Sequence, residues 1–467
     1  MKKAIVITLL FSAGLLSAQK TEWTSTTKAN PWVREKIITI KNAPVVGRRL
    51  IEIFPDRNQQ RMTGFGGCFN EFGWQALKSI PADKQEKIFE ELFSSTGANF
   101  IFNRLPIGAS DYSLDFYSYN ETKNDFGMKN FSIERDKNCL IPYIKRAQKY
   151  SQEMRFFASP WCPPSWMKVN ENYASRPNPK YNDLSPEMET ETGTTGFKMQ
   201  KGHLAAYALY FSKYLDAYKN EGITIGDLHV QNEVEAKQIF PSCLWQPQDL
   251  ALFISDYLGP RFESESRNVN IWLGTLNVAD FRYVQTAMNN IKAAKYIKGF
   301  GFQWAGKEMI ADAHQAYPQK HMMQTENECG SGENNWQSAE YTWSLIKHYL
   351  NRGAEAYIYW NFILQTPGVS HWGWEQNSMV TINKANGEVV YTPEFYVMKH
   401  LSHYVKPGAS LLSVSDDQDL LAFKNPDGKI IIVIANTTAT DKTQTLKVED
   451  KYLDVVLKAN SFNTIAL

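Results

Sequence analysis

Strand-like and helix-like stretches alternate through the middle of this chain, and that alternation restricts the possible fold more than any other feature. Predicted strands cover residues 63–67, 101–106, 155–160, 228–231, 270–274, 299–304, 321–326 and 356–361. Predicted helices cover residues 81–92, 140–150, 204–218, 247–257, 281–290, 308–317 and 338–350. Strands separated by helices favour parallel pairing, and eight such strands close a (β/α)8 TIM barrel. The sequence therefore predicts an α/β fold built on this barrel.

In the segments on either side of the predicted barrel, apolar residues recur with a period of two and show no helical spacing. Runs at 420–423, 430–435 and 454–457 are typical of strands, and Asn425-Pro426-Asp427-Gly428 is a turn signal between two of them. Leu50-Ile51-Glu52-Ile53 has the same character before the barrel. We therefore expect residues 62–392 to form the barrel, and residues 19–61 and 393–467 to form an accessory β-sandwich without helices.

The first residues have the features of an export signal. Lys2 and Lys3 precede an apolar run from Ala4 to Leu16, and small residues for cleavage stand at Ser17-Ala18. This run is too short to span a bilayer, and no other segment reaches 18 uninterrupted apolar residues. Residues 1–18 are predicted to be a signal peptide, so the mature protein is expected in the periplasm or outside the cell, with no transmembrane segment.

Composition argues against several classes of function. The formal net charge is only +1 and no basic tract interrupts the chain, which argues against a nucleic-acid partner. The eight His show no metal-binding spacing, and we expect neither a metal nor another cofactor. The five Cys lack any CxxC pair, and their pairing stays open, as does the oligomeric state. The 13% aromatic content suits stacking on sugar rings or, alternatively, a large aromatic core.

Two glutamates stand at matching places in this pattern. Glu233 follows the fourth predicted strand and Glu326 ends the seventh, and these strand ends face each other across a barrel mouth. A retaining glycosidase needs two carboxyl groups roughly 5–5.5 Å apart, one as acid/base and one as nucleophile. Asn232, just before Glu233, can bond a sugar hydroxyl beside the reacting carbon. Glu235 and Glu328 share the same strand parity, but they fall in the following loops.

Other polar and aromatic residues lie at or near the ends of the predicted strands. Arg104 can pair with a catalytic carboxylate and keep it ionised, or form a structural salt bridge under the barrel mouth. Asp111 can bond the outer hydroxyls of a terminal sugar. Trp161, Trp304 and Trp360 can stack on that sugar or, alternatively, pack in the core.

Several motifs, in order along nearly the whole mature chain, resemble the signatures of glycoside hydrolase family 30, which includes glucosylceramidases and β-1,6-glucanases. They are Thr63-Gly64-Phe65-Gly66-Gly67, Arg104-Leu105-Pro106-Ile107-Gly108, Asp111-Tyr112-Ser113, the segment Ala158–Lys168, Gln231-Asn232-Glu233 and Thr325-Glu326. The resemblance implies a (β/α)8 barrel with a side β-sandwich made from both termini, and retaining cleavage of β-glycosides. It implies that Glu233 is the acid/base and Glu326 the nucleophile. The sugar-contacting positions that it implies are Asp111, Trp161, Asn232, Trp360 and Asn377.

Two departures from the glucosylceramidase pattern bear on the substrate. Thr325-Glu326-Asn327-Glu328-Cys329 is one residue longer than the Ser/Thr-Glu-Ala-Cys pattern of glucosylceramidases, and Gln303-Trp304-Ala305 replaces a His-Trp-Tyr run. Both are more similar to the β-1,6-glucanase branch, which favours β-1,6-glucan over other β-glucosides. The alternatives are a glucosylceramidase-type exo-β-glucosidase, a β-xylosidase or β-fucosidase of the family, and a non-catalytic glycan-binding protein. Endo or exo action stays open.

Overall fold

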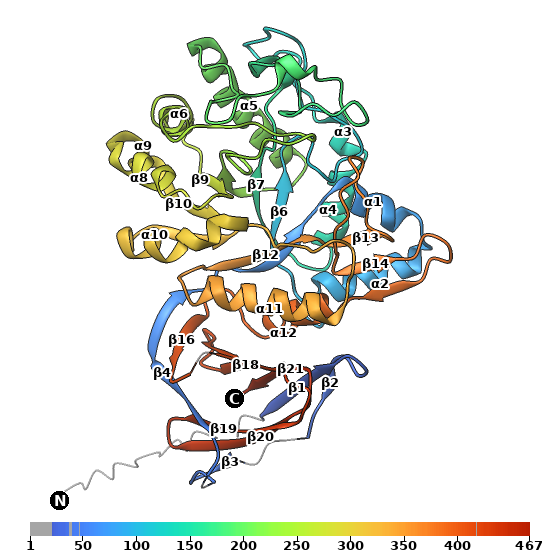
Figure 1. Cartoon of the computed structure of the whole chain (residues 1–467), viewed down its shortest axis with the longest axis vertical. Helices are drawn as coiled ribbons and strands as arrows, with labels where there is room; N and C mark the ends of the chain where they lie inside the picture. The colour runs from blue at the N-terminus through green and yellow to red at the C-terminus, as the bar shows by residue number, and fades with distance from the viewer. Residues whose placement is uncertain (1–20, 37–39, 46, 417) are drawn as a thin grey trace, which may run out of the picture.

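A computed structural model describes residues 21–36, 40–45, 47–416 and 418–467 of the chain. The predicted signal peptide, residues 1–18, lies outside these ranges. The described chain has two parts, a barrel of strands and helices and a smaller β-structure that contains both ends of the described chain (Figure 1). Among the described helices, none is long and apolar enough to cross a membrane.

The barrel contains the eight parallel strands that the alternation predicts. In barrel order they are β5 (Gly64–Cys68), β6 (Phe102–Pro106), β7 (Arg155–Ser159), β8 (Ile225–His229), β9 (Asn270–Leu276), β10 (Ile297–Phe302), β11 (His321–Gln324) and β12 (Ala356–Asn361). Parallel pairing runs from β11 round to β5 and on to β12. Between β11 and β12, where no continuous strand pairing is described, Met322 and Ala354 form an isolated parallel β-bridge. The predicted (β/α)8 barrel is confirmed.

Helices surround this barrel. They are α1 (Glu71–Lys78), α2 (Ala82–Phe93), α3 (Glu134–Lys137), α4 (Leu140–Gln148), α5 (Lys201–Asn220), α6 (Pro247–Phe253), α7 (Gly259–Ser264), α8 (Arg282–Asn289), α9 (Ile291–Tyr296), α10 (Ile310–Ala316) and α11 (Trp336–Leu350). Each of the longer helices buries an apolar stripe; in α2 the buried residues are Ile88, Phe89, Leu92 and Phe93. The segment predicted as one helix at 247–257 changes from α6 to a short π-helix at Ile254–Leu258 before α7.

The inside of the barrel is layered, and the layering places polar groups at one end. Phe102 belongs to an apolar cluster with Phe157, Trp272, Met323, Ala356 and Ile358. Because side chains two residues apart on a strand point the same way, Arg104 lies in the next layer toward the carboxyl ends of the strands. Apolar packing thus fills the lower barrel, while charged groups gather at the mouth.

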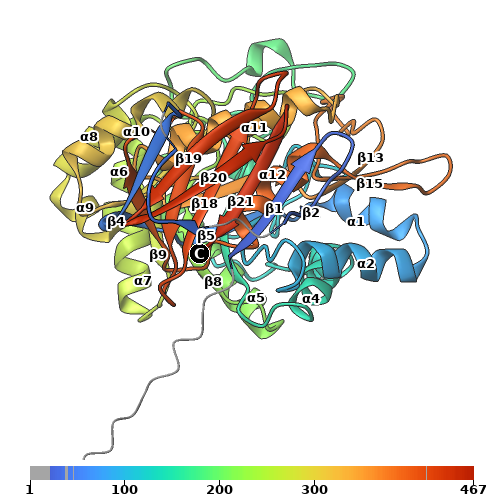
Figure 2. The ribbon, with the colours of Figure 1, turned by 90° about the horizontal axis from the view of Figure 1, so that it is seen from below.

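The accessory β-structure is one long sheet folded over on itself. Its strand order is β2 (Val33–Arg34), β1 (Glu22–Thr27), β21 (Ser461–Ala466), β18 (Ile430–Asn436), β17 (Leu420–Lys424), β16 (Ser410–Val414), β4 (Leu50–Arg61), β19 (Lys442–Val448), β20 (Lys451–Leu457) and β3 (Ile40–Lys41). Register shifts between β16 and β4 mark the bend. Segments from both ends of the chain therefore share the sheet, as predicted, and Figure 2 shows its strands from below.

The two faces of this sheet bury different apolar sets. Ile432 and Ile434 of β18 point into the sandwich core, which also holds Ile53, Leu446 and Val455. The alternate residues of β18 and β21 belong to the main core, where the Phe462 ring lies 5.1 Å from that of Trp336 on α11. Because side chains alternate between the two faces of a strand, one face of β18 and β21 packs in the sandwich core and the other packs against the barrel helices.

The expectation of a helix-free segment from residue 393 is wrong at its start. Pro393–Ser402 form helix α12, which with α11 lies between the barrel and the sandwich (Figure 1). The Thr392 side chain accepts a hydrogen bond from the Phe395 N–H and Pro393 occupies the first turn, so the local sequence does carry a helix start. The strands β13 (Ile363–Gln365), β14 (Val380–Ile382) and β15 (Val389–Tyr391) form a separate small sheet before it.

Candidate active site

Glu233 lies beyond the end of β8 in an unusual backbone conformation. Its φ is 50°, in the left-handed region, which costs a non-glycine residue about 1–3 kcal/mol. The Glu233 N–H donates to the Thr275 carbonyl oxygen at 3.0 Å and lies 3.1 Å from the Thr275 hydroxyl. Contacts to β9 therefore hold the strained turn that directs this side chain into the barrel mouth.

Glu326 follows β11 and pairs with a buried arginine. Nη1 of Arg104 donates to Glu326 Oε2 at 2.5 Å, and the Arg104 side chain is fully buried. Nη2 of the same guanidinium donates to Asn232 Oδ1 at 2.6 Å and to Ser159 Oγ at 2.9 Å. The guanidinium also lies 4.4 Å from the centre of the Trp161 ring. This network fixes both the arginine and the carboxylate that it holds.

A single amide touches both glutamates. Nε2 of Gln303, which follows β10, lies 3.1 Å from Glu233 Oε1 and 3.3 Å from Glu326 Oε2. Because one nitrogen makes both contacts, these oxygens are at most about 6.4 Å apart, 3.1 plus 3.3 Å. Oε1 of the same Gln303 amide accepts from the Thr325 hydroxyl at 2.8 Å, which fixes the amide orientation. The fourth and seventh strands thus bring the two predicted carboxylates together.

The two carboxyl groups have different electrostatic surroundings. Burial, followed by the nearby charge of Glu326, raises the pKa of Glu233 to about 8. Burial also raises the pKa of Glu326, but the guanidinium of Arg104 counters that rise. One carboxyl is therefore suited to carry a proton at neutral pH while the other is suited to stay ionised.

Both glutamates open into a pocket of about 230 Å³. It is lined by Asp111, Trp161, Glu233, Gln238, Phe240, Asn277, Trp304, Glu326, Trp374 and Gln376. Asp111 has a buried Oδ1 without a hydrogen-bond partner. Burial raises the pKa of Asp111 well above its usual range, with further increases from the two glutamates. An unsatisfied oxygen beside two carboxyls suits the hydroxyl groups of a bound sugar.

The remaining predicted residues lie behind this pocket. Asn232 is buried, and its Oδ1 accepts from Arg104, Thr275 and Gln303. Trp360 is fully buried, its ring centre 5.2 Å from that of Trp161. The Asn377 side chain donates to Glu394 at 2.9 Å and accepts from the Asn334 N–H at 3.1 Å, and it does not line the pocket.

The loop glutamates with matching parity have other partners. Glu235 accepts from the Tyr283 hydroxyl at 2.9 Å, and Glu328 pairs with Lys307 at 2.8 Å. Neither lines the pocket, where Glu233 and Glu326 lie instead.

Sequence reasoning assigned no role to several residues of this site. They are Gln238, Phe240, Asn277, Gln303, Trp374 and Gln376. Gln303 stood at a predicted strand end, a signal strong enough to propose it, but its contact with both carboxylates depends on the barrel closing. The others lie on loops after strands, where no periodic pattern marks a side chain as facing the site.

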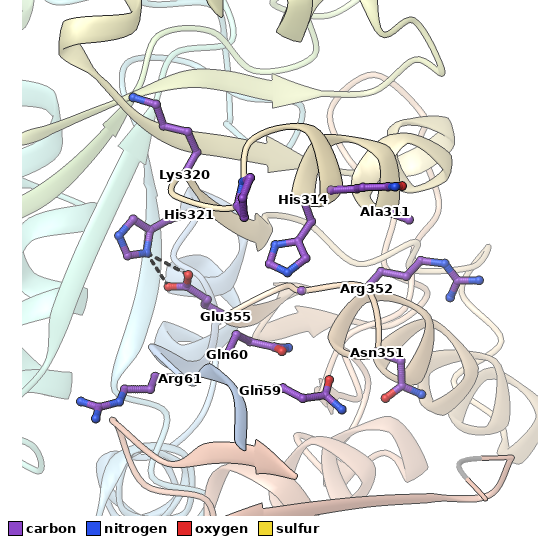
Figure 3. A pocket seen from close by; sticks show the side chains of 13 residues that line it. Gln59, Gln60, Arg61, Ala311, His314, Lys320, His321, Asn351, Arg352 and Glu355 are labelled. Atoms are coloured by element: carbon purple, nitrogen blue, oxygen red, sulfur yellow. Dashed lines mark hydrogen bonds and ion pairs between the residues drawn. The ribbon is translucent and has the colours of Figure 1, made fainter. Parts of the chain in front are cut away.

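A larger cavity, of about 750 Å³, lies among the residues at the amino-terminal end of β11, away from the two glutamates. In Figure 3 the side chains of Lys320, Arg61 and Arg352 point away from its centre, and His321 bonds Glu355 at 2.8 Å. It holds no pair of facing carboxyl groups, so the chemistry is assigned to the smaller pocket.

A barrel that holds two facing carboxyl groups in a polar, aromatic-walled pocket has the arrangement of a glycoside hydrolase. Residues 62–405 match the glycosyl hydrolase family 30 TIM-barrel domain, and residues 409–465 match the β-sandwich domain of the same family. The chain belongs to glycoside hydrolase family 30, as its motifs predicted.

Relatives within the family differ in what their names say they cleave. Putative glucosylceramidase 1 of Caenorhabditis elegans is 31% identical over 420 residues, 84% of this chain and 77% of the relative. Endo-1,6-beta-D-glucanase neg1 of Aspergillus fumigatus is 26% identical over 416 residues, 85% of this chain and 83% of the relative. The crystal structure of SrfJ from Salmonella typhimurium has the same fold, with a TM-score of 0.85 at 24% identity, covering 96% of this chain and 99% of that one.

Proposed function

We propose that this protein is an exported, retaining β-glycoside hydrolase that cleaves β-glucosidic bonds, with β-1,6-glucan as its substrate. The observation that carries the mechanism is the unequal pair: Glu326 is bound by Arg104, while Glu233 is not. The contacts of Gln303 keep one oxygen of Glu233 within about 6.4 Å of one oxygen of Glu326, which is compatible with the roughly 5–5.5 Å between the carboxyl groups of retaining enzymes.

In the proposed reaction, Glu326 attacks the anomeric carbon as Glu233 protonates the leaving glycosidic oxygen. The bond from the anomeric carbon to that oxygen breaks, and a glycosyl ester on Glu326 forms. Glu233, now ionised, takes a proton from water, whose oxygen attacks the same carbon and releases Glu326. Arg104 holds Glu326 ionised and oriented before attack.

The substrate proposal follows the two departures from the glucosylceramidase pattern and the name of the fungal relative. The lining of the pocket supports it. The amides of Gln238, Asn277 and Gln376 lie among the rings of Phe240 and Trp374, a mixture that suits sugar hydroxyls and sugar faces. The exposed Trp374 ring offers a stacking surface for a neighbouring sugar unit. Glucosylceramide is the second candidate, because the C. elegans relative carries that name.

Product analysis tests the substrate. Purified protein is incubated with pustulan, a linear β-1,6-glucan, and the products are measured by mass. A ladder of short oligosaccharides is expected and indicates endo cleavage, whereas glucose alone indicates exo cleavage. Pustulan left intact would reject the glucanase proposal, and glucosylceramide would then be the next substrate.

The assignment of the two glutamates is tested with azide on an aryl β-glucoside. In Glu326→Ala, azide enters from the vacated face in a single displacement, so an α-glucosyl azide is expected. In Glu233→Ala, azide attacks the glycosyl ester at Glu326 instead, so a β-glucosyl azide is expected. The reverse products would exchange the two roles. If both variants hydrolysed the aryl β-glucoside at the wild-type rate, this mechanism would be rejected. If the wild-type protein bound glucan without any turnover, a glycan-binding protein would be favoured.

Export is the remaining part of the proposal. The mass of the protein recovered from the periplasm or the medium is expected to match a chain that begins at Gln19. Recovery of the full-length chain inside the cell would reject export.

A further inference from the structure

Glu394 is a buried carboxyl group outside the catalytic pair. It lies in the first turn of α12, is 1% exposed, and makes no ion pair within the described chain. A buried carboxylate without a cation is costly unless hydrogen-bond donors surround it. The donors around Glu394 therefore indicate what its burial achieves.

Two side chains donate to the two oxygens of Glu394. The Thr342 hydroxyl, on α11, donates to Oε1 at 3.0 Å, and the Asn377 amide donates to Oε2 at 2.9 Å. Burial raises the pKa of Glu394 to about 7, while interactions with Tyr359, Thr342 and Asn377 counter the rise. A carboxylate accepts at both oxygens, so it orients both donors at once.

Asn377 joins two loops of the barrel mouth. Its backbone N–H donates to the Cys329 carbonyl oxygen at 2.7 Å, and its side-chain oxygen accepts from the Asn334 N–H at 3.1 Å. Cys329 and Asn334 belong to the loop between β11 and α11, which also carries Glu326. Asn377 itself lies in the loop between β13 and β14, which supplies Trp374 and Gln376 to the pocket. Its orientation therefore sets how these two loops meet.

Thr342 provides a second route toward the nucleophile. The Asn327 amide lies 3.5 Å from the Thr342 hydroxyl, and Asn327 directly follows Glu326. The hydroxyl of Tyr357, on β12, donates to the oxygen of the same Asn327 amide. Glu394 is thus connected to the nucleophile loop through Thr342 and through Asn377, without touching the pocket itself.

We propose that Glu394 is a positioning residue for glycoside cleavage: its carboxylate orients Asn377 and Thr342, and through them aligns the Glu326 loop with the pocket loop that carries Trp374. This inference rests on the proposed glycosidase function. It gives Asn377 a task in holding the site together.

The test exchanges donor and acceptor between positions 394 and 377. In Glu394→Gln, an NH2 group replaces one carboxylate oxygen and can no longer accept a hydrogen bond from the donor that it faces. The value of kcat on an aryl β-glucoside is then expected to fall about 10- to 100-fold, because small misplacements of catalytic groups are costly. In the double variant Glu394→Gln/Asn377→Asp, the new amide at position 394 donates to the new carboxylate at position 377. That carboxylate still accepts from the Asn334 N–H, so most of the lost kcat is expected to return.

Asp136→Asn is the matched control. Asp136 is another fully buried carboxyl group held by hydroxyl donors, on α3 and outside the pocket. Its donors are the hydroxyls of Tyr117, Tyr119 and Tyr218, at 3.1, 2.6 and 2.5 Å. Its replacement is expected to lower the melting temperature while leaving kcat of the folded enzyme unchanged.

The outcomes separate this inference from the proposed function. A wild-type protein without glycosidase activity would reject the proposed function. An active wild type with unchanged kcat in Glu394→Gln, or a loss that the double variant does not recover, would overturn the role of Glu394. If Glu394→Gln fails to fold, Thr342→Val removes one donor while retaining the carboxylate. That variant is then expected to lower kcat, and unchanged kcat would overturn the inference.

Discussion

At the scale of single residues, Arg104 gives two chemically identical glutamates different electrostatic surroundings. Its guanidinium binds Glu326 at 2.5 Å, whereas Glu233 accepts from the amide of Gln303 at 3.1 Å and forms no ion pair within the described chain. The sequence indicated that Arg104 can hold a catalytic carboxylate ionised, and it left open which one. The choice depends on where β6, β8 and β11 end relative to one another.

The raised pKa of Glu233 predicts the alkaline limb of the pH profile. In the proposed mechanism Glu233 donates a proton and must therefore be protonated, so kcat/KM on an aryl β-glucoside is expected to fall as pH rises through about 8. Rates measured between pH 4 and pH 10 provide the check. A dinitrophenyl leaving group departs without protonation. With such a substrate, the rate of glycosyl-ester formation in Glu233→Gln is expected to show no alkaline limb. A limb that persists there would assign it to another group.

Replacement of Arg104 should move the acid limb of the same profile. In the proposed mechanism Glu326 attacks as a carboxylate, and the guanidinium of Arg104 opposes the rise in its pKa that burial causes. In Arg104→Gln the acid limb is therefore expected to shift toward higher pH. Arg155→Gln, on β7 outside the pocket, is the control, with an unchanged limb expected. Equal profiles for the wild type and Arg104→Gln would show that the ion pair does not set the ionisation of Glu326.

At the scale of elements, β5 shows how a glycine-rich segment becomes a barrel strand. A Cβ at Gly66 would lie 1.9 Å from the Phe102 carbonyl oxygen on β6, so only glycine allows the two strands to approach this closely. The prediction of a strand at 63–67 is confirmed by β5, one residue later at each end.

Gly66→Ala is expected to lower the free energy of unfolding by about 1–3 kcal/mol, because β5 and β6 must separate to admit the methyl group. Urea unfolding followed by circular dichroism measures the loss. Gly226→Ala on β8 is the matched control, since the nearest atom to its Cβ would be 3.9 Å away. Equal stabilities in the two variants would contradict the close approach of β5 and β6.

The elements that sequence reasoning located well are those with a strong period. The eight barrel strands lie where predicted, with shifts at their ends; the fourth is Ile225–His229, whereas 228–231 was expected. Beyond β8 the chain continues to Asn232, which forms an isolated parallel bridge with Thr275 on β9. The residues expected at the end of this strand therefore lie beyond its continuous pairing. The helix α12 was missed, because the period-two pattern of residues 420–457 was extended back to residue 393.

At the scale of the whole molecule, the sandwich is attached through one face of its sheet. Phe462 on β21 is 2% exposed, and its ring centre lies 5.1 Å from that of Trp336 and 6.4 Å from that of Trp343. Both tryptophans belong to α11, the helix that also carries Thr342. The contact therefore joins the sandwich to an element that supports the active site.

Phe462→Ala is expected to lower the free energy of unfolding by about 3–5 kcal/mol, because it leaves a cavity between the sandwich and α11. Thermal unfolding followed by tryptophan fluorescence provides the measurement. Val456→Ala, at a 48% exposed position of β20, is the control and should change little. Equal midpoints for the two variants would indicate that this contact contributes little to holding the two parts together.

What the sequence determined by itself is local: strand and helix periods, the barrel that they imply, and two glutamates at the ends of the fourth and seventh strands. These features follow from side-chain spacing along one backbone segment. Tertiary structure decided which side chains meet, since Arg104 reaches Glu326 across 222 positions and Asn232 across 128. It also decided the contacts of Gln303 with both glutamates, the raised pKa of Glu233 and the link from Glu394 to the loop that carries Glu326. Each of these depends on barrel closure and burial, which no local pattern encodes.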